Sequence, residues 1–127
     1  HPVAQDRQLR IVSESAEINF YNDVILLKRV LGNLIKNALE ATPNRESVLA
    51  GCEVQQDQVR FWVRNPGIIP RNVQLQIFNR SFTTKGAGRG LGTYSVKVLT
   101  EHYLGGTVGF TSSPKEDTTF WISLPKK

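Results

Sequence analysis

The sequence has little cysteine, no methionine and no long apolar run. A single cysteine, Cys52, excludes a disulfide framework and a metal site built from several cysteines. It also favours a reducing compartment, so we expect a cytoplasmic domain. No apolar stretch approaches the roughly 20 residues needed to cross a bilayer, so we expect no membrane contact by this domain. The chain opens at His1-Pro2, without methionine, and we therefore expect a piece of a longer protein.

The sequence also lacks a cluster of basic residues. Sixteen Lys and Arg against eleven Asp and Glu give a net charge of +5, which favours anionic partners such as nucleotide phosphates. The basic residues are scattered and no basic run with interleaved aromatics is present, so nucleic acid is not an expected partner. The 127 residues, 39% of them hydrophobic, suffice for one compact domain and not for two. Residues 1–127 are therefore expected to form a single domain.

The spacing of apolar residues predicts helices and strands along the whole chain. In order, it predicts strands over 9–13 and 17–21, a helix over 24–41, strands over 47–55 and 58–64, a helix over 94–104, and strands over 107–112 and 118–124. Gln56-Asp57 is the expected turn between the middle strands, and Pro70 is expected to open a short helix toward Phe78. This order predicts an α+β fold, a two-layer α/β sandwich with helices on one face of a mixed, mostly antiparallel sheet.

A glycine-rich segment, GAGRGLGT at residues 86–93, directly follows Thr84 and Lys85. Glycines beside a hydroxyl and a cation favour phosphate binding. The P-loop pattern is excluded because no lysine follows these glycines, and the dinucleotide pattern G-x-G-x-x-G would need a glycine at Leu91 or Thr93. What remains is a loop over 79–92 that ends at a helix N-terminus, where unpaired N–H groups favour an anion. A flexible surface loop without a ligand is the alternative.

Two asparagines, Asn33 and Asn37, lie four residues apart in the first predicted helix and therefore on one side of it. Asparagine is disfavoured inside helices because its amide competes with the backbone for hydrogen bonds. A pair of them beside an apolar face indicates convergent polar groups, and an amide oxygen is a hard ligand that suits Mg²⁺. A polar pair on the solvated side of the helix is the alternative interpretation.

Five segments follow one another in a characteristic order. They are NLIKNALEA at 33–41, NPG at 65–67, IFNRSFTTK at 77–85, GAGRGLGT at 86–93 and DTTFWISLP at 117–125. In this order they resemble the N box, the first glycine box, the F box, the second glycine box and the closing strand of the catalytic, ATP-binding domains of sensor histidine kinases. The resemblance implies the Bergerat ATP-binding fold, which those domains share with gyrase-type topoisomerases, mismatch-repair proteins and heat-shock chaperones.

The resemblance implies how the phosphates of ATP would be held. Asn37 would coordinate the Mg²⁺ that bridges the phosphates, and Asn33 would orient the phosphates or a metal-bound water. Lys85, with Thr84, would neutralise the terminal phosphates. The second glycine box would wrap them, and its residues here are Gly88, Gly90, Leu91, Gly92 and Thr93.

The resemblance also implies how the base would be held. Asn65 would face the adenine amino group, Thr118 would support it from the neighbouring strand, and Gly67 would let the backbone approach the base, because a Cβ there would collide with it. The resembled family usually has aspartate at Asn65, and glycine at Ile69 and Asp117. An amide carries a donor and an acceptor and can flip to present either. The sequence therefore predicts weak discrimination against GTP, and tighter ATP binding in Asn65→Asp.

The implied function is that of a protein-histidine kinase, with ATP and Mg²⁺ as cofactors. In related ATPases a glutamate stands at Asn33 and activates water, whereas asparagine cannot accept a proton at neutral pH. The γ-phosphoryl group would then be kept for a histidine on an upstream dimerisation domain of the same protein, expected to be a homodimer. A response regulator receiver domain would be the next partner. Neither His1 nor His102 lies in a helix like that of the acceptor histidine. A nucleotide-binding regulatory module with degenerate phosphotransfer and an ATPase clamp are the alternatives.

Overall fold

The computed structural model describes residues 8–13, 24–43, 46–79 and 91–126. Its elements are β1 (Gln8–Ser13), α1 (Val24–Ala41), β2 (Ser47–Gln55), β3 (Gln58–Asn65), α2 (Arg71–Gln74), α3 (Leu91–Val98), the π-helical turn η2 (Leu99–Tyr103), β4 (Thr107–Ser113) and β5 (Asp117–Pro125). The predicted strand over 17–21 lies outside the described residues. The predicted bounds of the first helix and of the strand over 47–55 are confirmed.

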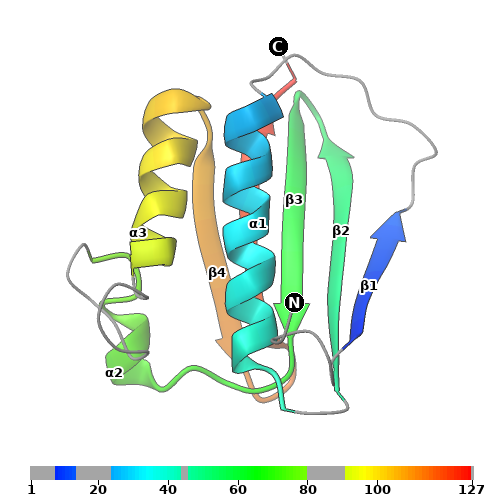
Figure 1. Ribbon diagram of the computed structural model, residues 1–127, viewed down its shortest axis with the longest axis vertical. Helices are drawn as coiled ribbons and strands as arrows, with labels where there is room; N and C mark the ends of the chain where they lie inside the picture. The colour runs from blue at the N-terminus through cyan, green and yellow to red at the C-terminus, as the bar shows by residue number, and fades with distance from the viewer. Residues whose placement is uncertain (1–7, 14–23, 44–45, 80–90, 127) are drawn as a thin grey trace.

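The strands form one five-stranded sheet in the order β1-β2-β3-β5-β4. β1 pairs with β2 in parallel, and the other three pairs are antiparallel. Figure 1 shows α1 and α3 side by side on one face of this sheet. The predicted α+β sandwich with a mixed, mostly antiparallel sheet is therefore confirmed.

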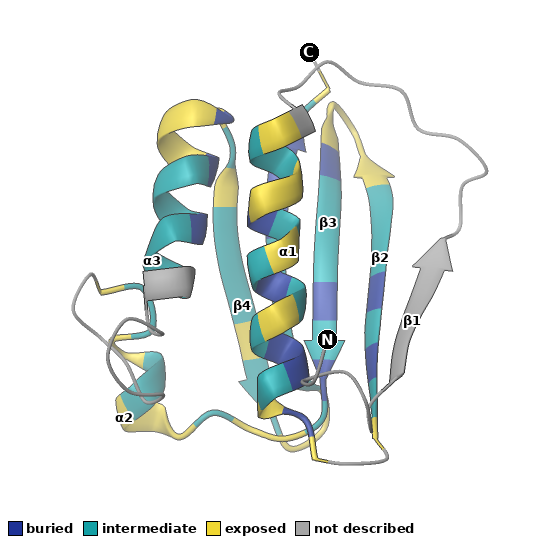
Figure 2. Ribbon diagram, in the orientation of Figure 1, coloured by how far each residue is buried: buried dark blue, intermediate teal, exposed yellow. Residues whose placement is uncertain are grey.

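One side of α1 supplies the helical half of the core. Val30, Leu34 and Ala38 recur every four residues and are 0%, 3% and 6% exposed, whereas Lys28 and Lys36 are exposed. Figure 2 shows exposed residues of α1 on its side away from the sheet. The helix ends after Ala41, where the Thr42 hydroxyl donates to the Ala38 carbonyl at 2.6 Å. This bond occupies one of the carbonyls that the last helical turn leaves without a partner.

The sheet supplies the other half of the core through the alternate residues of its strands. Ala50 pairs with Val63, and Val63 pairs with Phe120, so these three side chains lie on the helix-covered face. Phe120 stacks on Phe110 of β4 with ring centroids 5.3 Å apart, and Phe78 meets both rings edge-on at 5.9 and 6.2 Å. Phe78 therefore anchors the segment after α2 to the last hairpin.

The helix predicted over 94–104 begins three residues earlier, at Leu91. The prediction that residues 91 and 92 belong to the glycine-rich loop is therefore wrong. The apolar periodicity begins only where α3 meets the core, with Val96 at 0% exposed, so it gives no signal for the first turn. At its other end the helix widens into η2, where the Leu104 N–H donates to the Leu99 carbonyl at 2.9 Å.

The sheet face opposite the helices carries a tryptophan pair. Trp62 of β3 lies across from Trp121 of β5, and Gly109 of β4 lies on the other side of Trp121. The Arg60 guanidinium lies 4.0 Å from the centroid of a Trp121 ring. Within the described ranges, no helix has both the length and the apolar character of a membrane span.

Candidate functional site

The base-binding residues expected from the sequence meet at the end of β3. Asn65 is the last residue of that strand and pairs with Thr118 of β5, so their side chains lie on the same face. Both are buried, with 7% and 2% of their surface exposed. The expectation that Thr118 lies beside Asn65 on the neighbouring strand is confirmed.

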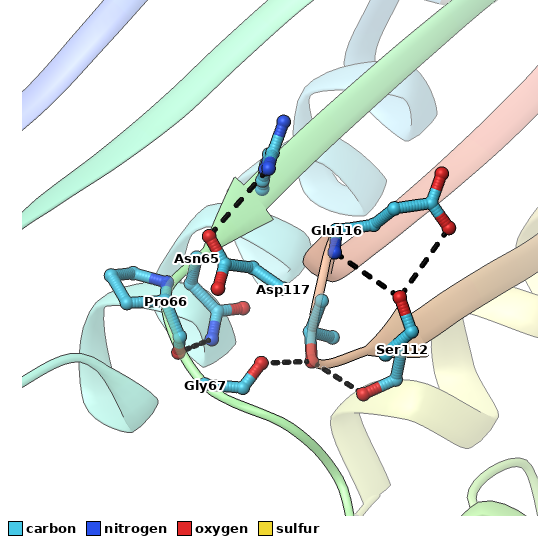
Figure 3. A network of polar contacts seen from close by, with 9 residues as sticks. Asn65, Pro66, Gly67, Ser112, Glu116 and Asp117 are labelled. Atoms are coloured by element: carbon cyan, nitrogen blue, oxygen red, sulfur yellow. Dashed lines mark hydrogen bonds and ion pairs between the residues drawn. The ribbon is translucent and has the colours of Figure 1, made fainter.

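The Asn65 amide is held in one orientation by the backbone that follows it. Its Nδ2 donates a hydrogen bond to the Pro66 carbonyl at 2.9 Å (Figure 3). The reverse orientation would place the amide oxygen against a carbonyl oxygen, which has no hydrogen to offer. The free flip expected from the sequence is therefore opposed by this bond, and Oδ1 remains as the acceptor.

A chain of hydrogen bonds joins the segment after β3 to the last hairpin. The Ile69 N–H donates to Ser112 Oγ at 2.8 Å. Ser112 Oγ lies 2.8 Å from Thr118 Oγ1, which donates to the Gly67 carbonyl at 2.9 Å; Figure 3 draws these last two contacts. The sequence reasoning missed Ser112, because it lies 43 residues from Ile69 and a serine in a strand carries no local signal. Only the sheet register brings these groups together.

Two residues near this end have left-handed backbone conformations. Gly67 has φ +101°, and a Cβ built there would meet no protein atom within 4 Å. Within the described protein, glycine is therefore required by conformation, and the expected collision with a base stays a prediction. Asp117 has φ 57° and stands where the resembled family has glycine. Its carboxylate lies 3.6 Å from the Arg64 guanidinium, and the two side chains are 43% and 39% exposed, so water screens the pair and it stabilises little.

Asn33 and Asn37 lie on α1, which packs against both β3 and α3. Both asparagines are half-buried, whereas the neighbouring Gly32 and Lys36 are exposed. The pair therefore does not lie on the solvated side of the helix. Its amide oxygens suit Mg²⁺, an ion that is commonly held by one or two protein oxygens together with phosphates and water. The donor set is thus compatible with a metal that arrives with a nucleotide.

The expected phosphate-binding segment is described only at its end. Leu91 and Gly92 form the start of α3, where the first backbone N–H groups have no partner within the helix. The Thr93 hydroxyl donates to the Ile77 carbonyl at 2.7 Å, which ties this helix to the segment after α2. Thr84, Lys85, Gly88 and Gly90 lie outside the described residues, and their roles stay predictions.

Comparison with known proteins agrees with the geometry. A family model for histidine kinase-, DNA gyrase B- and HSP90-like ATPases matches residues 22–127. Over 97% of its length the chain is 34% identical to the sensor histidine kinase CusS of Escherichia coli (strain K12). Over 98% it is 33% identical to the sensor protein IrlS of Burkholderia pseudomallei (strain K96243). It covers only 27% and 28% of those two proteins, about a quarter of their length.

Solved structures of the same kind superpose closely. The catalytic domain of histidine kinase ThkA matches with a TM-score of 0.82 and 29% identity, over 95% of this chain and 81% of that one. Full-length ShkA in complex with AMPPNP matches at 0.81 with 27% identity, over 98% of this chain and 27% of that one. ThkA in complex with the response regulator protein TrrA matches at 0.79 with 25% identity, over 95% of this chain and 34% of that one.

Proposed function

The chain belongs to the histidine kinase-, DNA gyrase B- and HSP90-like ATPase family, and we propose that it binds Mg-ATP and donates the γ-phosphoryl group to a histidine. That histidine lies on an upstream dimerisation domain of the same protein, which acts as a homodimer. The receiver domain of a response regulator then takes the phosphoryl group. ThkA in complex with the response regulator protein TrrA supports the proposed receiver domain, and ShkA in complex with AMPPNP supports the proposed binding of ATP. The domain works on the cytoplasmic side, without nucleic acid or membrane contact of its own.

The observation that carries the proposal is the asparagine pair on α1. Asn33 and Asn37 are half-buried on a helix that packs against α3, and α3 begins where the glycine-rich segment ends. We infer that this pair holds the phosphates of a nucleotide whose base lies at the Asn65 end of β3. Amide oxygens bind a hard cation, and amide nitrogens donate hydrogen bonds to phosphate oxygens. One asparagine pair can therefore bind both the cation and the phosphates.

Each residue of the site has one task in this mechanism. Asn37 Oδ1 would hold Mg²⁺, which would supply charge neutralisation at the phosphates, and Asn33 would orient a phosphate oxygen or a water. Lys85, with Thr84, neutralises the terminal phosphates, and the backbone of Gly88, Gly90, Leu91, Gly92 and Thr93 encloses them. The attacking nucleophile is the imidazole nitrogen of the partner domain. The work of this chain is therefore positioning and charge neutralisation.

Calorimetric titration with ATP, with and without Mg²⁺, tests the binding step. Wild type should bind more tightly with Mg²⁺, and Asn37→Ala should lose most of that gain because the metal loses a protein ligand. Lys36→Ala is the matched control, since Lys36 is exposed beside Asn37 on the same helix. Unchanged Mg-ATP affinity in Asn37→Ala would remove Asn37 from the metal site.

Transfer of label from γ-labelled ATP to the histidine-bearing region of the parent protein tests the second step. We expect an acid-labile, base-stable phosphoryl group on that region. ATP binding without transfer would favour a nucleotide-binding regulatory module. The residues Asn65 and Ile69, which replace the usual aspartate and glycine of the resembled family, are compatible with that alternative.

A further inference from the structure

The directions of the hydrogen bonds around Ser112 follow from simple counting. A hydroxyl has one hydrogen, and a carbonyl oxygen can only accept. The hydrogen of Thr118 therefore goes to the Gly67 carbonyl, at 2.9 Å. The contact of 2.8 Å between the two hydroxyls must then use the hydrogen of Ser112, whose oxygen accepts from the Ile69 N–H. The donor and the acceptor are therefore defined for each hydrogen bond that links Ile69, Ser112, Thr118 and Gly67.

This order fixes what Thr118 can offer to a ligand. Its hydrogen is used by Gly67 and one lone pair is used by Ser112, so its oxygen can only accept one further hydrogen bond. Asn65 Oδ1, on the paired residue of β3, is likewise an acceptor because Nδ2 is held by the Pro66 carbonyl. The end of β3 and β5 therefore presents two acceptors side by side.

We propose that Ser112 is a positioning residue that keeps the Thr118 hydroxyl an acceptor and so favours adenine over guanine. The inference rests on the proposed function, namely that the nucleotide base lies at this end of the sheet. The amino group of adenine brings two hydrogens to a pair of acceptors. Guanine has a carbonyl oxygen at the same position. That oxygen would face the two acceptor oxygens of Asn65 and Thr118 with no hydrogen to form a bond. A site with matched polar groups rejects the analogue that leaves them unpaired.

The Ser112→Ala variant tests this role. Without Ser112, the Ile69 N–H loses its acceptor, and the segment that carries the Gly67 carbonyl is no longer tied to β4. The Thr118 hydrogen can then turn from the Gly67 carbonyl toward a guanine carbonyl. We expect the ratio of ATP to GTP affinity to fall about fivefold, the size of effect expected for one hydrogen bond. Competition of ATP and GTP against a fluorescent ATP analogue, on the whole 127-residue chain, measures the ratio.

Two further variants separate positioning from a general structural role. Ser112→Thr keeps the hydroxyl and a strand-compatible side chain, so it should keep the wild-type ratio. Ser113→Ala removes the adjacent hydroxyl on β4, which contacts Glu116 on the turn instead, and should change neither affinity. Circular dichroism and thermal midpoints confirm that each variant is folded.

Three results would overturn the inference. They are an unchanged ratio in Ser112→Ala, an equal loss of both affinities, and a failure of Ser112→Thr to restore the ratio. Failure of the proposed function is recognised separately, because wild type would then bind neither nucleotide.

Discussion

The Asn65 side chain shows how one backbone contact changes the meaning of a substitution. A carboxylate at this position cannot donate to the Pro66 carbonyl, which lies 2.9 Å from Nδ2, and would place two acceptor oxygens against each other. We therefore expect Asn65→Asp to weaken ATP binding about fivefold, the reverse of the expectation from sequence alone. Competition titrations of ATP and GTP measure the two affinities. Asn65→Ala is the comparison variant, because it removes both Oδ1 and Nδ2. Tighter ATP binding in Asn65→Asp would show that the carboxylate rotates away from Pro66.

Thr100 is fully buried, and its hydroxyl has no partner among the described residues. Burying an unpaired hydroxyl is costly, so Thr100→Val, which keeps the shape, should raise the free energy of unfolding by about 1 kcal/mol. Thr42 is the matched control: it is 2% exposed, but its hydroxyl donates to the Ala38 carbonyl at 2.6 Å. Thr42→Val should lower the free energy of unfolding by about 1 kcal/mol. Urea titrations measure the free energy of unfolding of both variants. A lower value in Thr100→Val as well as in Thr42→Val would mean that the Thr100 hydroxyl has a hydrogen-bond partner.

At the scale of elements, the sequence predicts those whose signals are local. The apolar residues of α1 recur at helical spacing from end to end, and Gln56-Asp57 forms the turn between β2 and β3 as expected. The first turn of α3 has no such signal and was missed. The parallel pairing of β1 with β2 and the contact of Ser112 with Ile69 depend on register between distant segments. Local pattern cannot supply that register.

The approach of β4 to Trp121 is another feature that depends on register, and it yields an element-scale prediction. A Cβ at Gly109 would overlap the Trp121 ring, so Gly109→Ala should destabilise the protein by about 1–3 kcal/mol. Gly32 of α1 is the matched control, because a Cβ there meets nothing within 4 Å. Gly32→Ala should stabilise by roughly 0.5–1 kcal/mol through helix propensity. Thermal unfolding followed by tryptophan fluorescence compares both variants with the wild type. If Gly109→Ala were as stable as the wild type, the Trp121 indole would move aside at no cost in free energy.

At the scale of the whole molecule, the site is assembled from segments that are far apart in the sequence. Asn65 and Thr118 meet through the sheet, and the asparagine pair is brought over it by α1. The sequence predicts all four residues from the resembled boxes, but not their hydrogen bonds. The chain covers 27% of CusS, and its exposed His102 lies in η2. As proposed above, we expect the acceptor histidine to lie elsewhere in the parent protein.

The isolated chain should accordingly bind ATP without consuming it. Asn33 stands where the resembled ATPases have glutamate, and an amide cannot take a proton from water at neutral pH. Phosphate release from Mg-ATP should equal the rate without protein, and γ-labelled ATP should leave no label on the chain. Asn33→Glu supplies a general base and should raise phosphate release at least about tenfold, whereas Asn33→Gln, which keeps the amide, should not. Sustained release by the wild-type chain would instead favour an ATPase clamp, because a kinase domain must preserve the γ-phosphoryl group until the histidine arrives.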